Sequence, residues 1–287
     1  MKKMNIDANP LFNLDDYLNE LQAKLPNYDI NVNNANDFSI MLEEKENCEK
    51  CLGLYMCKNM NQGLCSRYED NSFKYEECRF KKELNEQNRN NSLIKTLYIS
   101  KAILNAKLED FEINSESRKK IYAQIVDFIN NFTFEERKKG LYLYGSFSIG
   151  KTFTLGCIAN ELAKNNIKSL LIYFPDLVSD IKMAIGTDRL AELINMLKSI
   201  DVLMLDDLGS ENLTPWVRDE ILGPVINYRV NENKPVFVSS NISPKDMITH
   251  LAIDKSPAGE LKAERIISRL QGLVVPVNMD DSNKYKR

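Results

Sequence analysis

A stretch of glycine, hydroxyl and lysine side chains at positions 145–152 has the composition of a phosphate-binding loop. It fits the pattern G-x-x-x-x-G-K-S/T and consists of Gly145, Ser146, Phe147, Ser148, Ile149, Gly150, Lys151 and Thr152. In such a loop, backbone N–H groups surround the phosphates, and the positive end of the following helix strengthens their binding. We expect Lys151 to reach the β- and γ-phosphates of a nucleotide and the Thr152 hydroxyl to hold Mg²⁺. The alternative is a glycine turn that carries a lysine by chance.

Two adjacent carboxylates follow the apolar run at 202–205, and an amide follows the apolar run at 236–238. Successive side chains of a strand point to opposite faces, so Asp206 can face Mg²⁺ while Asp207 polarises an attacking water. The Asn241 amide can hydrogen-bond both the γ-phosphate and that water. Taken singly, each of these residues also fits an ordinary strand end; together with the loop they predict a nucleotide hydrolysis site.

Two arginines, Arg265 and Arg269, are four positions apart and share one face of a predicted helix. A guanidinium suits the charge that spreads over a γ-phosphate during transfer, which makes the pair candidates for an arginine finger that acts on a neighbouring subunit. A solvated basic helix face is the alternative.

Five of the six cysteines lie close together in the sequence: Cys48, Cys51, Cys57, Cys65 and Cys78. A cytoplasmic chain keeps its thiols reduced, so such a cluster favours a metal over disulfides. Structural zinc takes four Cys or His ligands, often two of them from a C-x-x-C segment such as 48–51. The alternative is a group of buried cysteines without a metal. The single histidine, His250, is far from the cluster in the sequence and is expected at the surface.

The elements that position these residues show in the hydropathy pattern. Short apolar runs at 141–144, 170–174, 202–206, 236–240 and 273–277 indicate five strands, and helical spacing indicates helices at 115–131 and 151–165. Strands that alternate with helices predict a parallel sheet covered on both faces. Ligands bind such sheets at the carboxyl ends of the strands, where the phosphate loop, the carboxylates and the amide all fall.

Length and composition indicate two globular domains. The chain has 287 residues with 43% hydrophobic and 28% charged residues, and a domain takes about 150 residues. No apolar run approaches the roughly 18 residues of a membrane span, and the start of the chain lacks the apolar stretch of a secretory signal, so we expect a cytoplasmic protein. A polar segment at 84–93 marks the joint. We predict an N-terminal domain at 1–90, a linker at 91–114 and an ATPase domain at 115–287.

The charge distribution excludes a protein that binds duplex DNA through its overall charge. The net charge is −3, and residues 1–90 carry 12 Lys and Arg against 16 Asp and Glu. Nucleic-acid binding must therefore come from a local groove.

The motifs in combination resemble the AAA+ ATPases of the DnaC/DnaI helicase-loader family. The segments that carry the resemblance are GSFSIGKT, MLDDLGSE, TPWVRDEIL, VSSN, ERIISRL and the cysteine segment NCEKCLGLYMCKNMNQGLC. The resemblance covers essentially the whole chain. It implies an AAA+ domain with no C-terminal lid, behind a small zinc-binding N-terminal domain. It also implies that ATP hydrolysis serves to load the hexameric replicative helicase onto single-stranded DNA at initiation or restart.

The resemblance assigns roles to residues of this sequence. The residues that match the ATP site are Lys151, Thr152, Asp206, Asp207 and Asn241, and Arg269 best matches the arginine finger, with Arg265 as its neighbour. It favours Cys48, Cys51, Cys65 and Cys78 as zinc ligands, with Cys57 as a spare. The family pattern has a histidine near Cys65, and in this sequence cysteine holds that position. The N-terminal domain is then expected to hold the helicase, and the ATPase domain to bind single-stranded DNA and to self-associate.

The same resemblance singles out two further residues and one departure from the family pattern. Lys182 and Arg189 lie where loaders carry an additional helical element that faces the ring axis, so they are candidate DNA contacts, although a solvated helix face is equally consistent. Ser148 replaces a glycine found in many relatives, which predicts a stiffer loop.

Three other functions remain open from the sequence. A transposition-helper ATPase of the IstB type shares the AAA+ motifs but acts on a transposase, and the cysteine segment argues against it. A small-molecule P-loop kinase needs an acceptor pocket and usually a mobile lid. A structural adaptor with a degenerate site is disfavoured by the intact lysine, threonine and paired aspartates.

Overall fold

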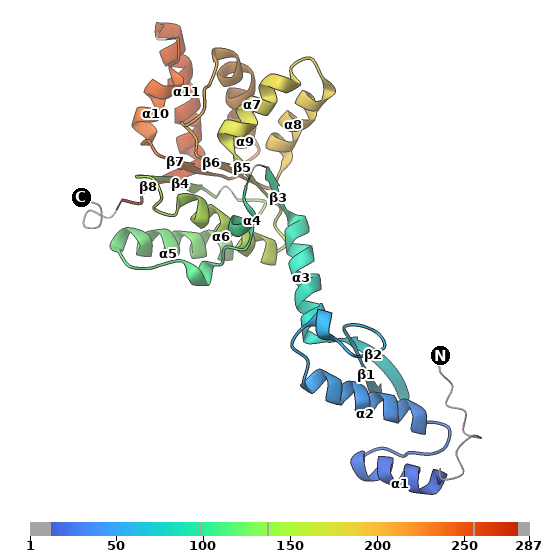
Figure 1. Ribbon diagram of the computed structural model, residues 1–287. Coiled ribbons are helices and arrows are strands. Elements are labelled where there is room, and N and C mark those ends of the chain that lie inside the picture. Colours follow the sequence, from blue (N-terminus) through green and yellow to red (C-terminus); the bar gives the residue numbers. More distant parts are fainter. Residues whose placement is uncertain (1–12, 98, 137, 255, 281–287) are drawn as a thin grey trace. The chain divides into compact units, whose positions relative to one another are not determined.

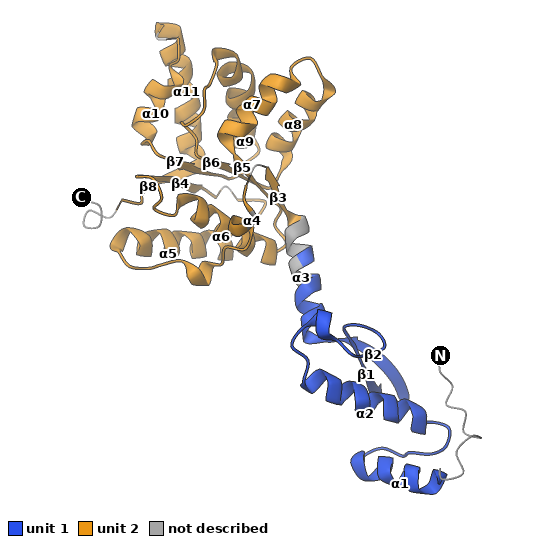
Figure 2. Cartoon of the chain, viewed as in Figure 1, with its two compact units in different colours: residues 1–88 blue, residues 89–287 orange. Residues whose placement is uncertain are grey.

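The computed structural model describes residues 13–97, 99–136, 138–254 and 256–280. The start of the chain, on which the expectation of no secretory signal depends, lies outside these ranges. The chain divides into two compact units, residues 1–88 and 89–287 (Figure 2).

The N-terminal unit combines two helices with a β-hairpin. Its elements are α1 (Leu14–Lys24), α2 (Ala35–Glu49), the short 3₁₀ turn η2 (Leu54–Met56), β1 (Leu64–Glu69), β2 (Ser72–Glu77) and the first part of α3 (Arg79–Leu93). The hairpin turns at Asp70 and Asn71, which both have positive φ, as a two-residue turn between twisted antiparallel strands requires. Phe38 is fully buried and packs against Tyr68 and Phe73 of the hairpin, and Leu25 and Met41 complete the buried part of this small core.

The second unit is built on a six-stranded parallel sheet in the order β3-β5-β6-β7-β4-β8. The strands are β3 (Ile94–Leu97), β4 (Gly140–Tyr144), β5 (Ser169–Tyr173), β6 (Val202–Asp206), β7 (Val236–Ser240) and β8 (Val274–Asn278). Five of them match the predicted runs. The prediction of five strands is wrong by one, because β3 lies within 91–114, the segment expected to be a linker, and pairs with β5.

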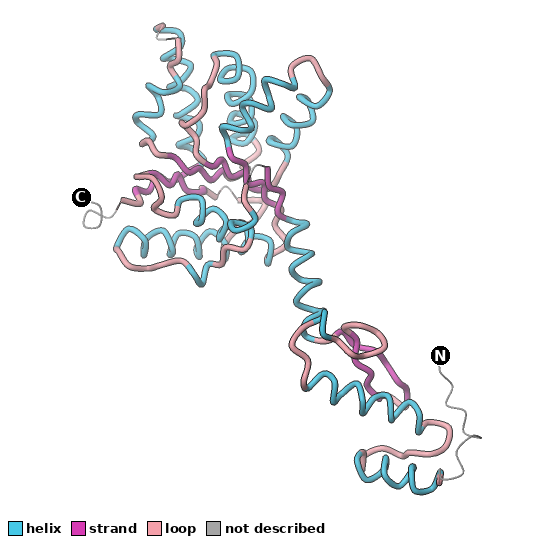
Figure 3. The backbone as a smooth tube through the Cα atoms, viewed as in Figure 1, coloured by secondary structure: helices cyan, strands magenta, loops and turns pink. Residues whose placement is uncertain are grey.

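Helices cover both faces of this sheet (Figure 1). One face carries α5 (Glu116–Asn130) and α6 (Lys151–Lys164), with α4 (Lys101–Leu104) and the short turn η3 (Leu108–Asp110) beside them. The other face carries α7 (Phe174–Ala184), α8 (Asp188–Ser199), the π-helical segment η4 (Val217–Leu222), α9 (Gly223–Asn231), α10 (Pro244–Leu251) and α11 (Pro257–Leu273). The strands form one layer between them (Figure 3).

Alternating side chains of the strands build two separate cores. Along β6, Leu203 and Leu205 join the core on the α7–α11 side, whereas Val202 and Met204 join the core with α5 and α6. Every residue of β6 is buried, as expected for a central strand covered on both faces. Asp206 ends this strand at the carboxyl edge of the sheet.

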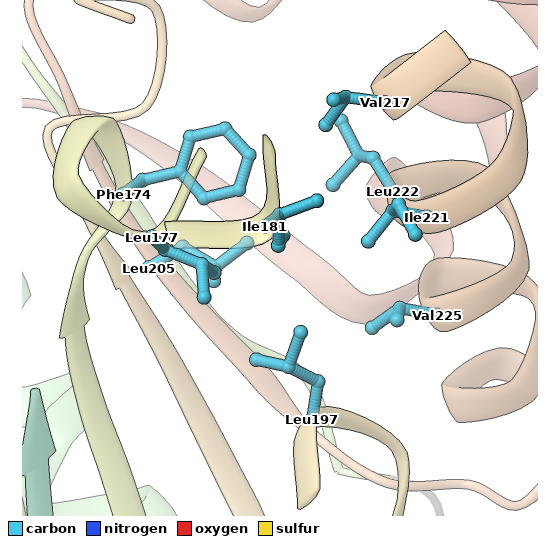
Figure 4. Close-up of a pocket in the computed structure, with 9 residues that line it drawn as sticks. All are labelled: Phe174, Leu177, Ile181, Leu197, Leu205, Val217, Ile221, Leu222 and Val225. Carbon is cyan, nitrogen blue, oxygen red and sulfur yellow. The ribbon is translucent and has the colours of Figure 1, made fainter. Parts of the chain in front are cut away.

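A cavity of about 10 Å³ remains in the core on the α7 side. Only apolar side chains line it, from α7, α8, β6, η4 and α9: Phe174, Leu177, Ile181, Leu197, Leu205, Val217, Ile221, Leu222 and Val225 (Figure 4). This volume admits about one water molecule and its lining offers no polar partner, so it is a packing gap.

Within the described residues, no helix is long and apolar enough to cross a membrane.

Candidate nucleotide site

The loop between β4 and α6 has the backbone of a phosphate-binding loop. Gly145, Ser148 and Gly150 have φ values of 142°, 60° and 93°. Such reversals between right- and left-handed conformations turn successive N–H groups into one concave surface. Ser148 therefore adopts a conformation that glycine reaches at lower cost. The stiffer loop expected from this serine stays a prediction.

Lys151 lies at the first position of α6 and its side chain folds back over the loop. Its Nζ donates to Gly145 O (2.9 Å), Ser146 O (2.6 Å) and Asn241 Oδ1 (2.8 Å). The residue is 7% exposed, and burial lowers the pKa of the ammonium group from its ordinary value. A buried lysine side chain thus lies between the phosphate loop and the end of β7.

Asp206 is buried at the end of β6 and accepts two hydroxyl hydrogen bonds on one oxygen. Thr152 Oγ1 donates to Asp206 Oδ1 over 2.8 Å, and Ser239 Oγ donates to the same atom over 2.6 Å. Burial raises the pKa of Asp206 above its ordinary value, and the two hydroxyl donors oppose that rise. Carboxylate and hydroxyl oxygens in contact are the donor set that Mg²⁺ takes from proteins.

Asp207 and Asn241 face each other across the ends of β6 and β7. Asn241 Nδ2 donates to Asp207 Oδ1 over 2.8 Å, while the Asp207 N–H donates to Ser239 Oγ over 2.9 Å. Asp207 has a φ of 59°, in the left-handed region. Ser239 therefore contacts both aspartates. It was not among the predicted site residues, because a serine at a strand end points to a site only when the neighbouring strand is known.

A pocket at this edge of the sheet brings these side chains together. Its lining consists of Ile103, Phe147, Ser148, Gly150, Lys151, Thr152, Phe153, Tyr173, Asp206, Asp207, Ser239 and Asn241. Ile103 belongs to α4, in the segment predicted to be a linker. The structure thus places most of the predicted phosphate loop, both carboxylates and the amide around one space; the predicted loop residues Gly145, Ser146 and Ile149 do not line it.

The predicted arginines and DNA contacts lie elsewhere. Arg265 and Arg269 are exposed on α11 and do not line this pocket. Lys182 Nζ donates to Asn212 O over 2.7 Å, and Arg189 pairs with Asp180 over 2.7 Å. Both candidate DNA contacts thus have partners within the chain.

The five clustered cysteines line a pocket in the N-terminal unit. Cys48 Sγ and Cys65 Sγ are 2.9 Å apart, and burial together with the neighbouring Cys48 raises the pKa of Cys65 to about 12. Asn59 Nδ2 donates to Cys48 Sγ and Gly63 N to Cys57 Sγ, each over 3.4 Å. Within the described ranges, the side chains do not bring three Cys, His, Asp or Glu residues into a group that could hold a metal. His250 contacts Glu211, in the other unit.

Comparison with known proteins identifies the family. The family model of the bacterial DnaA ATPase domain matches residues 107–257. The replicative helicase loader DnaI of Bacillus subtilis is 36% identical over 248 residues, which are 85% of this chain and 80% of that protein. This chain belongs to the DnaI family of helicase loaders.

Solved structures of relatives agree with this family and with an AAA+ fold. A crystal structure of DnaI is 38% identical, covers 65% of this chain and 97% of its own, and gives a TM-score of 0.61. The DnaC helicase loader is 27% identical, with 63% and 100% of the two chains covered and a TM-score of 0.51. The ATPase unit of this DnaI-family chain therefore has the architecture of an AAA+ ATPase, which bears out the resemblance.

Proposed function

We propose that this chain is an ATP-dependent loader that places a hexameric replicative helicase on single-stranded DNA at initiation or restart of replication. The observation that carries the proposal is the extent of the similarity to DnaI. Residues 89–287 number 199, whereas the match spans 248 residues, so it extends into the N-terminal unit. A transposition helper shares only the ATPase motifs, so similarity to such a protein would not explain a match in the N-terminal unit.

The ATP step begins at the phosphate loop. Lys151 Nζ, which now bonds loop carbonyls and Asn241, moves to the β- and γ-phosphates. Thr152 and Asp206 would hold Mg²⁺ with their contacting oxygens. When bound, the ion neutralises phosphate charge. The remaining loop N–H groups orient the triphosphate for in-line attack.

Asp207 and Asn241 act on the attacking water. Asp207 can take a proton from water, since its carboxylate lines the pocket and accepts a hydrogen bond from Asn241. Asn241 bonds both Lys151 and Asp207, so it is positioned to change partners when the γ-phosphate leaves. We infer that this amide reports the state of the nucleotide.

Self-association completes the site in this proposal. Arg269, with Arg265 as the neighbouring candidate, is exposed on α11 and does not line the nucleotide pocket of its own chain. A guanidinium on one subunit would then reach the γ-phosphate held by the next. Hydrolysis would thereby depend on assembly of the loader on the helicase.

The N-terminal unit would hold the helicase and a structural zinc ion. The fit of zinc rests on donor chemistry: five thiols line one pocket, and the side-chain amide of Asn59 and the Gly63 N–H each donate to one of the sulfur atoms. Cys48, Cys51, Cys65 and Cys78 are the proposed ligands, with Cys57 as the spare. Zinc would fix the fold of a unit with a small apolar core.

The test is a loading assay with the replicative helicase of the same host on circular single-stranded DNA. A circle has no free end, so only an opened ring can assemble on it. We expect ATP and this chain together to produce helicase on the circle and unwinding of an annealed strand. Copurification of a transposase, or turnover of a nucleoside without DNA, would instead support the transposition-helper or kinase alternative.

A further inference from the structure

An arginine outside the phosphate-loop motif contacts the loop directly. Arg118 lies in the first turn of α5, and its Nη2 donates to the carbonyl oxygen of Ile149 over 2.6 Å. The guanidinium also lies 5.4 Å from the ring centroid of Phe111, which is buried. A cation held by an aromatic ring and aimed at a loop carbonyl is a fixed donor.

The geometry of a peptide unit links this contact to the phosphate pocket. The described backbone contains no cis peptide bond, so the Ile149 carbonyl and the Gly150 N–H point in opposite directions. Because Arg118 occupies the carbonyl side, the Gly150 N–H faces away from the guanidinium. Gly150 itself lines the nucleotide pocket. A charged donor on the carbonyl also polarises the peptide and strengthens its N–H as a donor.

The loop needs such an external restraint. Ser148, a non-glycine residue, has a φ of 60°, and such a conformation persists where the surroundings hold it. The other end of the loop is held by the segment after β8, because Asp280 Oδ1 accepts from the Ser146 N–H over 2.8 Å. Ser117 Oγ of α5 in turn donates to Asn278 O at the end of β8. The first turn of α5 is thus tied both to the loop and to the end of β8.

We propose that Arg118 is a positioning residue for nucleotide binding: it holds the Ile149–Gly150 peptide so that the Gly150 N–H is presented to the phosphates. This inference deepens the proposed function and depends on the proposed nucleotide site. Arg118 contacts the loop and not the pocket, so its effect reaches the phosphates only through the peptide.

The experiment compares Arg118→Met, Arg118→Lys and Lys119→Met in the full chain. Methionine keeps the apolar stem and removes the donors; lysine keeps one donor. Lys119 is the matched control, because it is exposed on the same turn and pairs with Glu116. Calorimetry gives the Kd for a non-hydrolysable ATP analogue, and hydrogen exchange follows the amides of 145–150.

We expect Arg118→Met to weaken analogue binding by about tenfold, the size of a lost charge-assisted hydrogen bond. Exchange at 145–150 should rise, the KM for ATP should change more than kcat, and Arg118→Lys should restore part of the affinity. Lys119→Met should bind within about twofold of the unchanged chain. If Arg118→Met does not fold, Arg118→Lys decides. Weaker analogue binding and faster loop exchange than in Lys119→Met support the proposal, and values equal to those of Lys119→Met overturn it.

The proposal is overturned if Arg118→Met binds the analogue as tightly as the Lys119→Met control and its loop amides exchange at the unchanged rate. Lys151→Ala separates this failure from failure of the site. Loss of binding in Lys151→Ala with normal binding in Arg118→Met rejects only the role of Arg118. Unchanged binding in both variants rejects the nucleotide site itself.

Discussion

Thr152 Oγ1 donates a hydrogen bond to Asp206 Oδ1 over 2.8 Å, although the residues are 54 positions apart in the chain. One belongs to the first turn of α6 and the other ends β6. Ser239 holds the same carboxylate oxygen from β7. The two groups proposed to hold Mg²⁺ are therefore in contact, and a third residue fixes their arrangement.

Asp206→Asn should stabilise the nucleotide-free chain while abolishing Mg²⁺-dependent hydrolysis. Burial raises the pKa of Asp206, so the folded state disfavours the carboxylate, and stability is lost as pH rises through that raised pKa. Asparagine keeps the acceptor for Thr152 and Ser239 without the charge. Urea unfolding at pH 7 should show a free energy of unfolding about 1 kcal/mol higher for Asp206→Asn than for the unchanged chain. This difference should narrow as the pH falls. A less stable asparagine variant at pH 7 would contradict this account.

Lys151→Ala should abolish ATP binding, because the site loses the lysine that the proposal places on the β- and γ-phosphates. Calorimetry with an ATP analogue measures this. Lys164→Ala is the control, since Lys164 is at the far end of the same helix and pairs with Glu161. Retained nanomolar affinity in Lys151→Ala would rule out the site assignment.

Arg269→Ala should leave ATP binding nearly unchanged and lower hydrolysis by about 10³-fold. Mixing it with Lys151→Ala protein on single-stranded DNA should restore activity, because a mixed interface joins an intact loop to an intact arginine. Steady-state ATPase assays of the mixture measure the recovery. If mixed oligomers form but show no ATPase activity, the proposed role of Arg269 is rejected, and Arg265→Ala is tested in its place in the same assay.

The purified chain should contain about one zinc ion, bound by thiolates. Cys48→Ser and Cys78→Ser should release it and unfold the N-terminal unit while the ATPase unit stays folded. Metal analysis and circular dichroism check both statements. Cys157→Ser is the control, because Cys157 is buried in α6 and bonds Lys107 O. A metal-free chain with a folded N-terminal unit would reject the zinc site.

Arg229→Met should destabilise the ATPase unit by about 3–5 kcal/mol. Arg229 is fully buried in α9, and its guanidinium donates to the carbonyls of Leu197, Lys198, Ile200, Asp201 and Pro235. Methionine fills similar space but leaves those carbonyls without this donor. Thermal unfolding of the full chain measures the loss. A change below about 1 kcal/mol would show that water replaces the guanidinium.

The parts of the fold that the sequence predicted are those with a strong local signal. Strands such as 202–206 are buried on both faces, so their apolar runs stand out from the polar connections. The strand β3 has only four residues, adjoins the polar segment 84–93, and becomes a strand by pairing with β5. That pairing joins residues 75 positions apart, for example Ile94 and Ser169, which no local pattern contains.

The candidate site divides in the same way. Lys151 and Asp206 belong to motifs whose spacing is visible in the chain, and the structure brings them to one pocket. Arg118, Ser239 and Asp280 contact those motifs from distant segments, so only the fold reveals them. Arg269 needs a second copy of the chain for its proposed role, which a single chain does not contain.

The position of β3 determines where the chain can be truncated without exposing an edge of the sheet. A fragment that begins after residue 97 lacks β3, and the backbone groups of residues 169–172 that face it lose their partners. An uncovered strand edge is a template for pairing between molecules. Aggregation of such a fragment would reflect this exposed edge and would say nothing against the stability of the ATPase core.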